Sequence, residues 1–394
     1  MDYQRLLEFC NTDRQEELVR AVEAGDGTIA EAVRLLGWEG ASTNYRRMFR
    51  DVLARASKSG YAPDSSNMRG EAPAGFTVKR HSARFDRDGN AAGGWLITEP
   101  TKTQAWEAFE QSCNDLVENM KGLAEPAPAP AYADSDLLTV VPLGDPHFGM
   151  MSWAAETGEN FDLEIAERIT VNAVDRLTEM LPSTETALLL NLGDYFHADN
   201  GSNRTPRSGV QLDVDGRFQK IASVGFRAMI RCIDRLLIKH KKVIVRNNRG
   251  NHDPHQAAML TIAVDAYYHN EPRVDVETSP SGFYYLRFGK NLIGSTHGDG
   301  AKLGSLSEIM AHDRPQDWAK TAFRVWHCGH FHHNQSKEQI GCTIETHRTL
   351  AATDAWHSYQ GYRSGRDLKG IVYHKDFGEM SRVRCGVEMI EGEE

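Results

Sequence analysis

The sequence predicts an α/β fold for the larger, C-terminal part of the chain, and two observations lead to this prediction. After residue 135, five short apolar runs have the length and composition of buried strands. Between them, segments 161–181 and 221–236 carry apolar residues at helical spacing. Strands that alternate with amphipathic helices are typical of a sheet covered by helices. The five runs are 137–143, 186–192, 242–248, 291–296 and 323–329.

Length and composition exclude several classes of protein. The 394 residues are enough for two or three domains, and 40% of them are apolar, as in an ordinary globular chain. No apolar run reaches the roughly 20 residues that span a bilayer, and the N-terminus has no signal-peptide core, so no membrane association is expected. The net charge of −10 confines any nucleic-acid contact to a local basic surface. Six scattered cysteines without a CxxC motif predict reduced thiols in the cytoplasm.

The first 60 residues predict a small helical domain of the helix-turn-helix type. Helices are expected over 14–24, 28–36 and 43–57, with Ser42 as the N-cap of the third. The third helix concentrates positive charge at Arg46, Arg47 and Arg50, as a DNA-recognition helix does. A small helical bundle that grips a protein partner is the alternative.

The next segments predict a hairpin and a linker before the α/β domain begins. Residues 76–98 contain two β-prone runs around an Asp-Gly turn signal, and a helix is expected over 103–122. The Ala/Pro-rich stretch that follows, within residues 123–135, predicts a spacer between domains. The expected domains are therefore 1–60, helix-turn-helix-like; 61–122, hairpin plus helix; 123–135, linker; and 136–394, the α/β domain. Of the 16 histidines, 15 lie at or after His147, in this last domain.

Each of the five apolar runs ends in a small polar cluster. Because the carboxyl ends of parallel strands meet at one edge of a sheet, we expect these clusters to converge there. In an extended segment residues i and i+2 point the same way, so each D-x-H or H-x-H pair would aim two side chains at one place. The clusters are Gly144-Asp145-Pro146-His147, Gly193-Asp194-Tyr195-Phe196-His197, Gly250-Asn251-His252-Asp253, His297-Gly298-Asp299 and Gly329-His330-Phe331-His332-His333.

Imidazoles, carboxylates and an amide in one place predict a centre with two divalent metal ions. Mixed nitrogen and oxygen ligands suit manganese, iron or zinc more than calcium or magnesium. We expect Mn²⁺, with iron or zinc as alternatives. One carboxylate can bridge two cations about 3.5–4 Å apart. Glycine before the clusters would let the backbone turn sharply and leave space for a ligand.

The series D-x-H, G-D, G-N-H-D, H-G and G-H-x-H, over about residues 137–350, resembles the calcineurin-like metallophosphoesterases. The resemblance implies a four-layer fold of two β-sheets flanked by helices. It also implies a set of metal ligands. These would be Asp145, His147 and His332 for the first ion, Asn251, His297 and His330 for the second, and Asp194 as the bridge between them.

The same resemblance implies the catalytic residues. His252 would be the catalytic histidine, with Asp253 orienting it. His197, three residues after Asp194, is similar to a histidine of the nuclease branch, the DNA double-strand-break repair exonucleases, which lies near the metals and the substrate phosphate. The alternative is that His197 is a loop residue or a support for the ligands.

The implied reaction is hydrolysis of a phosphoester by hydroxide that two metal ions share. The overall layout is similar to that of metallophosphoesterases encoded by tailed bacteriophages and prophages, which would place the protein in the bacterial host cytoplasm. We therefore expect a DNA nuclease or phosphodiesterase, with DNA at both the basic helix and the active-site cleft. The alternatives are a phosphatase acting on phosphoproteins or small phosphoesters, and a DNA-binding regulator with a vestigial site.

Overall fold

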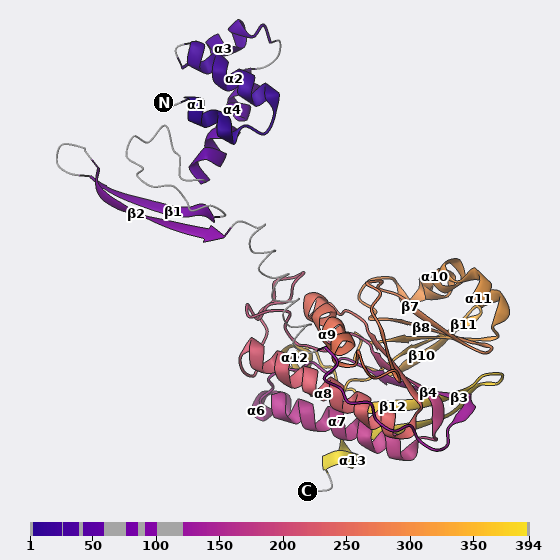
Figure 1. Ribbon diagram of the computed structural model, residues 1–394. Helices are drawn as coiled ribbons and strands as arrows, with labels where there is room; N and C mark the ends of the chain where they lie inside the picture. Colours follow the sequence, from indigo (N-terminus) through magenta and orange to yellow (C-terminus); the bar gives the residue numbers. More distant parts are fainter. Residues whose placement is uncertain are drawn as a thin grey trace. The chain divides into compact units, whose positions relative to one another are not determined.

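The chain divides into two compact units, Met1–Asn114 and Asp115–Glu394, each described here by itself. The computed structural model describes residues 3–25, 27–38, 42–58, 76–85, 91–100 and 121–391 (Figure 1). Most of the helix predicted over 103–122, and the turn predicted at 86–90, lie outside these residues.

The first unit contains the three predicted helices and the predicted hairpin. The helices are α2 (Asp13–Ala24), α3 (Ile29–Leu35) and α4 (Ser42–Lys58), preceded by α1 (Tyr3–Leu6) and a short 3-10 turn (Leu7–Phe9). Helix α4 begins at Ser42 itself, one residue earlier than predicted. Strands β1 (Phe76–Phe85) and β2 (Ala91–Pro100) pair antiparallel.

The helices of this unit pack around a small core. Apolar residues recur every three or four positions along α4, so one face is buried and the opposite face is left to charged residues. Thr12 caps α2 by accepting a hydrogen bond from the backbone N–H of Gln15. The buried residues of α4 are Tyr45, Phe49, Val52 and Ala56.

The second unit holds two mixed β-sheets. The six-stranded sheet has the order β13-β12-β3-β4-β5-β6, in which β3 to β6 run parallel. The five-stranded sheet has the order β10-β11-β9-β8-β7, in which β8, β9 and β11 run parallel. The strands are β3 (Asp134–Leu143), β4 (Thr184–Asn191), β5 (Lys242–Asn247), β6 (Val274–Glu277), β7 (Tyr284–Phe288), β8 (Asn291–Thr296), β9 (Phe323–Cys328), β10 (Gln335–Gln339), β11 (Cys342–Thr346), β12 (Asp367–His374) and β13 (Gly378–Gly386).

Helices cover the outer face of each sheet. Helices α7, α8 and α9 contact the six-stranded sheet, and α10 contacts the five-stranded one (Figure 1). The helices of this unit are α6 (Ala154–Thr157), α7 (Leu163–Met180), α8 (Phe218–Lys239), α9 (Pro254–Tyr267), α10 (Leu306–Asp313), α11 (Pro315–Lys320), α12 (Ala355–Tyr359) and α13 (Glu388–Glu391), with a 3-10 turn at Leu303–Ser305.

Three hydrophobic clusters separate the four layers. Along β3, Val141 and Leu143 pack toward the helices, whereas Leu138 and Val140 pack toward the other sheet. A third cluster, around the fully buried Trp326, joins the five-stranded sheet to α10. The predicted sandwich of two sheets flanked by helices is therefore confirmed, and all five predicted strands are present.

The Ala/Pro-rich stretch predicted to be a spacer lies against the second unit. The backbone N–H of Ala127 donates to the Glu271 carboxylate at 2.7 Å, and Arg273 donates to the carbonyls of Ala127 and Pro128. Further up the chain, the N–H of Ala124 donates to the carbonyl of Tyr267. An extended backbone without internal hydrogen bonds leaves these groups free to pair with a neighbouring surface.

Within the described part of the chain, no helix has the length and apolarity needed to cross a membrane. The five cysteines in this part are all free thiols.

Candidate metal centre

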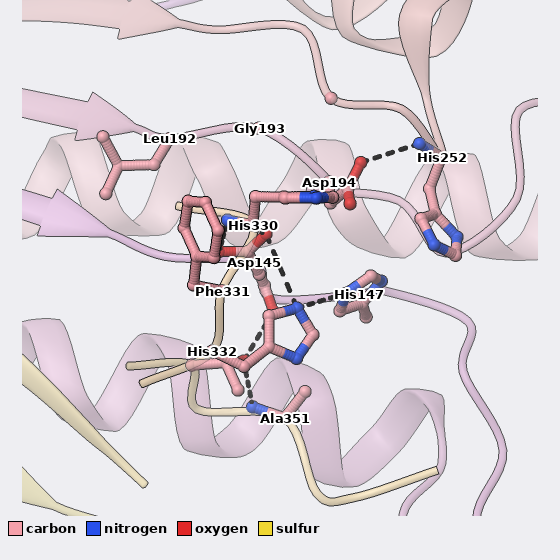
Figure 2. Close-up of polar contacts among 12 residues, drawn as sticks. Asp145, His147, Leu192, Gly193, Asp194, His252, His330, Phe331, His332 and Ala351 are labelled. Carbon is pink, nitrogen blue, oxygen red and sulfur yellow. Dashed lines mark hydrogen bonds and ion pairs between the residues drawn. The ribbon is translucent and has the colours of Figure 1, made fainter. Parts of the chain in front are cut away.

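All seven predicted metal ligands converge at one edge of the two sheets. Figure 2 shows five of them, Asp145, His147, Asp194, His330 and His332. They lie in the loops that follow β3, β4, β5, β8 and β9. Pairing of the parallel strands holds the strand ends level, because Leu143, Asn191 and Asn247 are register partners, as are Thr296 and Cys328. Segments more than 180 residues apart thus deliver side chains to one place.

The first group of donors consists of Asp145, His147 and His332. The Nε2 atoms of His147 and His332 lie 3.2 Å apart, and the Nε2 atom of His332 lies 3.6 Å from Oδ1 of Asp145. Asp145 and His147 are buried, and the side chain of His332 is 18% exposed. The three donor atoms lie within 4.8 Å of one another, a spacing that fits one cation.

The second group consists of Asp194, His297 and His330, with Asn251 beside it. The Nε2 atom of His297 lies 3.2 Å from Oδ2 of Asp194 and 3.1 Å from Oδ1 of Asn251. On the other side of its ring, Nδ1 of His297 lies 3.8 Å from Oδ1 of Asp145, which joins the two groups. The bridging role of Asp194 stays a prediction.

The electrostatics of the site favour bound cations. Burial alone would lower the pKa of His297, but Asp194 and Asp145 outweigh it and raise the pKa to about 10. The pKa of Asp194 is held well below its usual value despite burial, because His297 stabilises the carboxylate. The two carboxylates are buried, and their neighbours are neutral or cationic imidazoles rather than lysine or arginine. This donor set fits two divalent ions of the manganese, iron or zinc type.

The backbone at the ligands is strained. Among the described residues, six non-glycine residues have a positive φ, and five of these six are predicted ligands. Such conformations cost about 1–3 kcal/mol each and concentrate at functional sites. The five are Asp145 (44°), His147 (49°), Asp194 (48°), His330 (67°) and His332 (53°).

This finding corrects the predicted geometry of the D-x-H and H-x-H pairs. We expected an extended backbone to point residues i and i+2 the same way. Instead both members of each pair are left-handed, and Asp145 and His147 lie in a loop after β3 has ended. The convergence therefore depends on two tight backbone turns, not on the alternation of a strand.

Three glycines make room for ligand side chains rather than for an external molecule. A Cβ on Gly250 would lie 1.9 Å from Oδ1 of Asp194, and one on Gly193 would lie 2.6 Å from Nδ1 of His297. A Cβ on Gly329 would lie 2.7 Å from Oδ2 of Asp145. The predicted space is present, but the ligands themselves fill it.

His252 lies beside the ligands, and its position depends on Asp194 and His197. Its backbone N–H donates to Oδ1 of Asp194 at 2.7 Å, and its Nδ1 lies 2.8 Å from the carbonyl oxygen of His197. Contrary to the prediction, Asp253 does not contact the ring of His252. Its carboxylate accepts hydrogen bonds from the backbone N–H groups of Phe196 and Gly250, so it ties the loops together.

His197 is buried beside His147 of the first group of donors. Its Nδ1 lies 3.3 Å from Nδ1 of His147, and burial followed by the nearby His252 lowers its pKa to about 3. A neutral His197 can accept or donate one hydrogen bond to His147 and so fix the orientation of that ring. Its predicted catalytic role stays a prediction.

The ligands open into a cavity of about 330 Å³. One end is lined by residues that the sequence singled out, which are Asp194, His197, Asn251, His252, His330 and His332. The other walls come from residues that the sequence left unassigned, because no motif marks them. These are Thr205, Ser208, Val210, Gln211, Leu212, Asp213, Asp354, Ala355, Trp356 and His357.

A separate buried cluster of His327, Glu345 and His347 has metal-like spacing but differs in its charges. Lys369 and Arg382 each donate to the Glu345 carboxylate at 2.8 Å. Two cations already neutralise this carboxylate, so the cluster is a satisfied polar network in the core.

Two arginines of the second unit that could hold a phosphate, Arg314 and Arg366, are both engaged within the protein. Arg314 forms an ion pair with Asp317. Arg366 pairs with Glu159 and donates to the carbonyl oxygen of Leu350 at 3.0 Å.

Comparison with known proteins gives fold neighbours only. No family model and no curated protein matches the chain. A dimetal phosphatase from Danio rerio aligns at 8% identity over 64% of this chain and 99% of its own, with a TM-score of 0.37. An archaeal phosphodiesterase aligns at 10% identity over 63% and 99%, with a TM-score of 0.31. An uncharacterised Streptococcus pneumoniae protein, described as a predicted phosphoesterase, aligns at 10% identity over 64% and 98%, with a TM-score of 0.25.

Proposed function

We propose that the protein is a phosphoester hydrolase that depends on two divalent metal ions, and that its substrate is a phosphodiester of DNA. The observation that carries the proposal is the convergence of seven nitrogen and oxygen donors, five of them on strained backbone, at one sheet edge. Strain of this kind persists only where the surrounding structure enforces it. A vestigial site would have no reason to retain it.

When bound, the metal pair would supply a nucleophilic hydroxide and neutralise charge on the phosphate. One ion would be held by Asp145, His147 and His332. The other would be held by Asn251, His297 and His330, and Asp194 would be shared between the two. The residues of the chain then perform the remaining tasks.

His252 is the residue best placed to act on the substrate. It lines the cavity next to the ligands, and its Nδ1 faces the carbonyl oxygen of His197 at 2.8 Å. If Nδ1 carries the proton that this carbonyl accepts, Nε2 is left for the substrate. In this neutral form Nε2 can accept a proton. Once Nε2 is protonated as well, its N–H can donate to a phosphoryl oxygen or pass the proton to the leaving oxygen.

The choice of DNA is supported by the basic face of α4. Arg46, Arg47 and Arg50 are exposed, whereas the opposite face of α4 is buried in the core of the first unit. Arg55 is different, because it donates to the carbonyl oxygen of Phe9 and to the side chain of Gln15 within the unit. Three exposed cations on one helix can contact backbone phosphates. We call them the exposed arginines of α4.

The test is a parallel assay of the Mn²⁺-loaded protein. The substrates are linear duplex DNA, single-stranded DNA, bis-p-nitrophenyl phosphate and p-nitrophenyl phosphate, and metal content is measured in every preparation. We expect turnover of the diesters, and we expect His252→Ala to reduce it by about 10²–10⁴-fold while two metals stay bound.

Two outcomes would contradict the proposal. Efficient turnover of the monoester alone would favour a phosphatase. Absence of turnover on every substrate by the metal-loaded protein would exclude phosphoester hydrolysis.

A further inference from the structure

We infer that the cavity beside the metal ligands binds an unpaired nucleobase, so that the substrate is a phosphodiester in single-stranded or locally opened nucleic acid. The inference takes the proposed phosphoester hydrolysis as its premise. It begins from a row of aromatic rings that leads outward from the ligand His332, and two of these rings, His357 and Trp356, line the cavity. We call His357, Trp356 and Tyr362 the aromatic wall.

The rings of the aromatic wall are in contact with the metal centre and with each other. The ring of His357 stacks on that of the ligand His332, with 4.9 Å between centroids and an interplanar angle of 18°. Trp356 meets His357 edge-on at 4.9 Å, and Tyr362 lies roughly parallel to Trp356 at 6.1 Å. A base that stacks here would therefore belong to a nucleotide close to the reacting phosphate.

The aromatic wall is held in place before any ligand arrives. Asp354 caps α12 by accepting a hydrogen bond from the backbone N–H of His357 at 2.7 Å, and the same oxygen lies 2.8 Å from Nδ1 of the His357 ring. Trp356 nevertheless stays 57% exposed. A large aromatic side chain that faces solvent in a cavity, on a fixed helix, is typical of a binding surface.

Another part of the cavity lining comes from the loop after the second cluster and has a different character. Val210 is 52% exposed and offers an apolar contact. The hydroxyls of Thr205 and Ser208 bond to each other at 2.6 Å, and the side-chain nitrogen of Gln211 donates to the carbonyl oxygen of Asn203, so these groups would meet a base through their remaining hydrogen-bonding positions. The exposed Arg207 lies on the same loop. Apolar faces, polar edge partners and a nearby cation are the requirements of a base attached to a phosphate chain.

These features distinguish a base from the side chain of a phosphoprotein. A phosphoserine or phosphothreonine has no flat face for Trp356. A phosphotyrosine has a face but lacks the heteroatom-rich edge that Gln211, Thr205 and Ser208 would contact. The cavity of about 330 Å³ also exceeds what a single phenyl ring fills.

The test compares strands that have bases with strands that lack them. The Mn²⁺-loaded full chain is assayed on a single-stranded oligothymidylate and on an abasic oligomer of the same length, and the ratio of the two KM values is the readout. Base stacking predicts an abasic KM about 5- to 100-fold higher for the natural protein.

Substitutions assign that ratio to the aromatic wall. Trp356→Ala should bring the ratio close to 1, and Trp356→Phe should retain part of it. The matched control is Trp153→Ala, because Trp153 is 63% exposed but does not line the cavity. Its ratio should equal that of the natural protein. Thermal unfolding and metal content confirm that each variant is folded and loaded.

Several results would overturn the inference while leaving hydrolysis intact. They are a ratio near 1 in the natural protein, an unchanged ratio in Trp356→Ala, or faster hydrolysis of a phosphotyrosyl peptide than of either strand. Loss of all phosphoester turnover in the natural metal-loaded protein would instead contradict the proposed function itself.

Discussion

Replacing Gly250 by alanine should disrupt the metal centre without changing any ligand. An added Cβ would lie 1.9 Å from Oδ1 of Asp194 and 2.2 Å from the backbone nitrogen of the same residue. A new side-chain rotamer of Asp194 can relieve the first clash but not the second, so one of the two loops must move. The backbone of Gly250 itself has no positive φ, so the effect is purely steric.

The expected magnitude follows from overpacking of a buried contact. Such insertions lower the free energy of unfolding by about 1–3 kcal/mol. For a unit of this size, each kcal/mol lowers the midpoint temperature of thermal unfolding by about 2–4 °C. Because Asp194 also pairs with His297, we expect metal affinity to fall at least roughly 10- to 100-fold.

The assay is thermal unfolding together with Mn²⁺ titration, with Gly300→Ala as the control. Gly300 lies three residues after His297, has no positive φ, and a Cβ there would meet nothing within 4 Å. The control should match the natural protein in both measurements. If Gly250→Ala also bound two ions with natural affinity and unfolded at the natural temperature, the assignment of Asp194 to the centre would be refuted.

Two further predictions concern the polar core and the basic helix. Burial alone would raise the pKa of Glu345, but His347 and the hydrogen bonds from Arg382 and Lys369 hold it well below its usual value. Glu345→Gln should therefore lower the free energy of unfolding by about 3–5 kcal/mol at pH 7. This difference should be present above the pKa of Glu345 in the unfolded chain, which is near 4.3, and it should be lost as the pH falls through the lower pKa of Glu345 in the folded protein. Urea unfolding from pH 3 to 8 measures this, and a pH-independent difference would contradict it. Replacing all three exposed arginines of α4 by alanine should weaken DNA binding and flatten its salt dependence by up to about 0.9 per lost phosphate contact. Titration of labelled DNA at several salt concentrations tests this, and an unchanged slope would assign α4 to another partner.

The strands and the polar clusters could be predicted because both are local patterns. Buried parallel strands such as β4 are continuous apolar runs, and each cluster follows its run directly. Six strands were missed. The edge strands β10 and β13 are mostly exposed and rich in charged residues, so they carry no apolar run, and their pairing depends on partners far away in the chain.

The order of the clusters along the chain was enough to identify the ligands of the site, because each cluster follows a strand whose end must reach the same edge. The conformation of those ligands was not predictable. The positive φ of Asp145 and His330 is imposed by packing against other loops, and local sequence favours the opposite region for both. The placement of Trp356 beside His332, through His357, likewise depends on tertiary packing, because strands β10 and β11 separate α12 from the loop after β9 in the chain. Local sequence thus determined which residues take part, and long-range packing determined how they face one another.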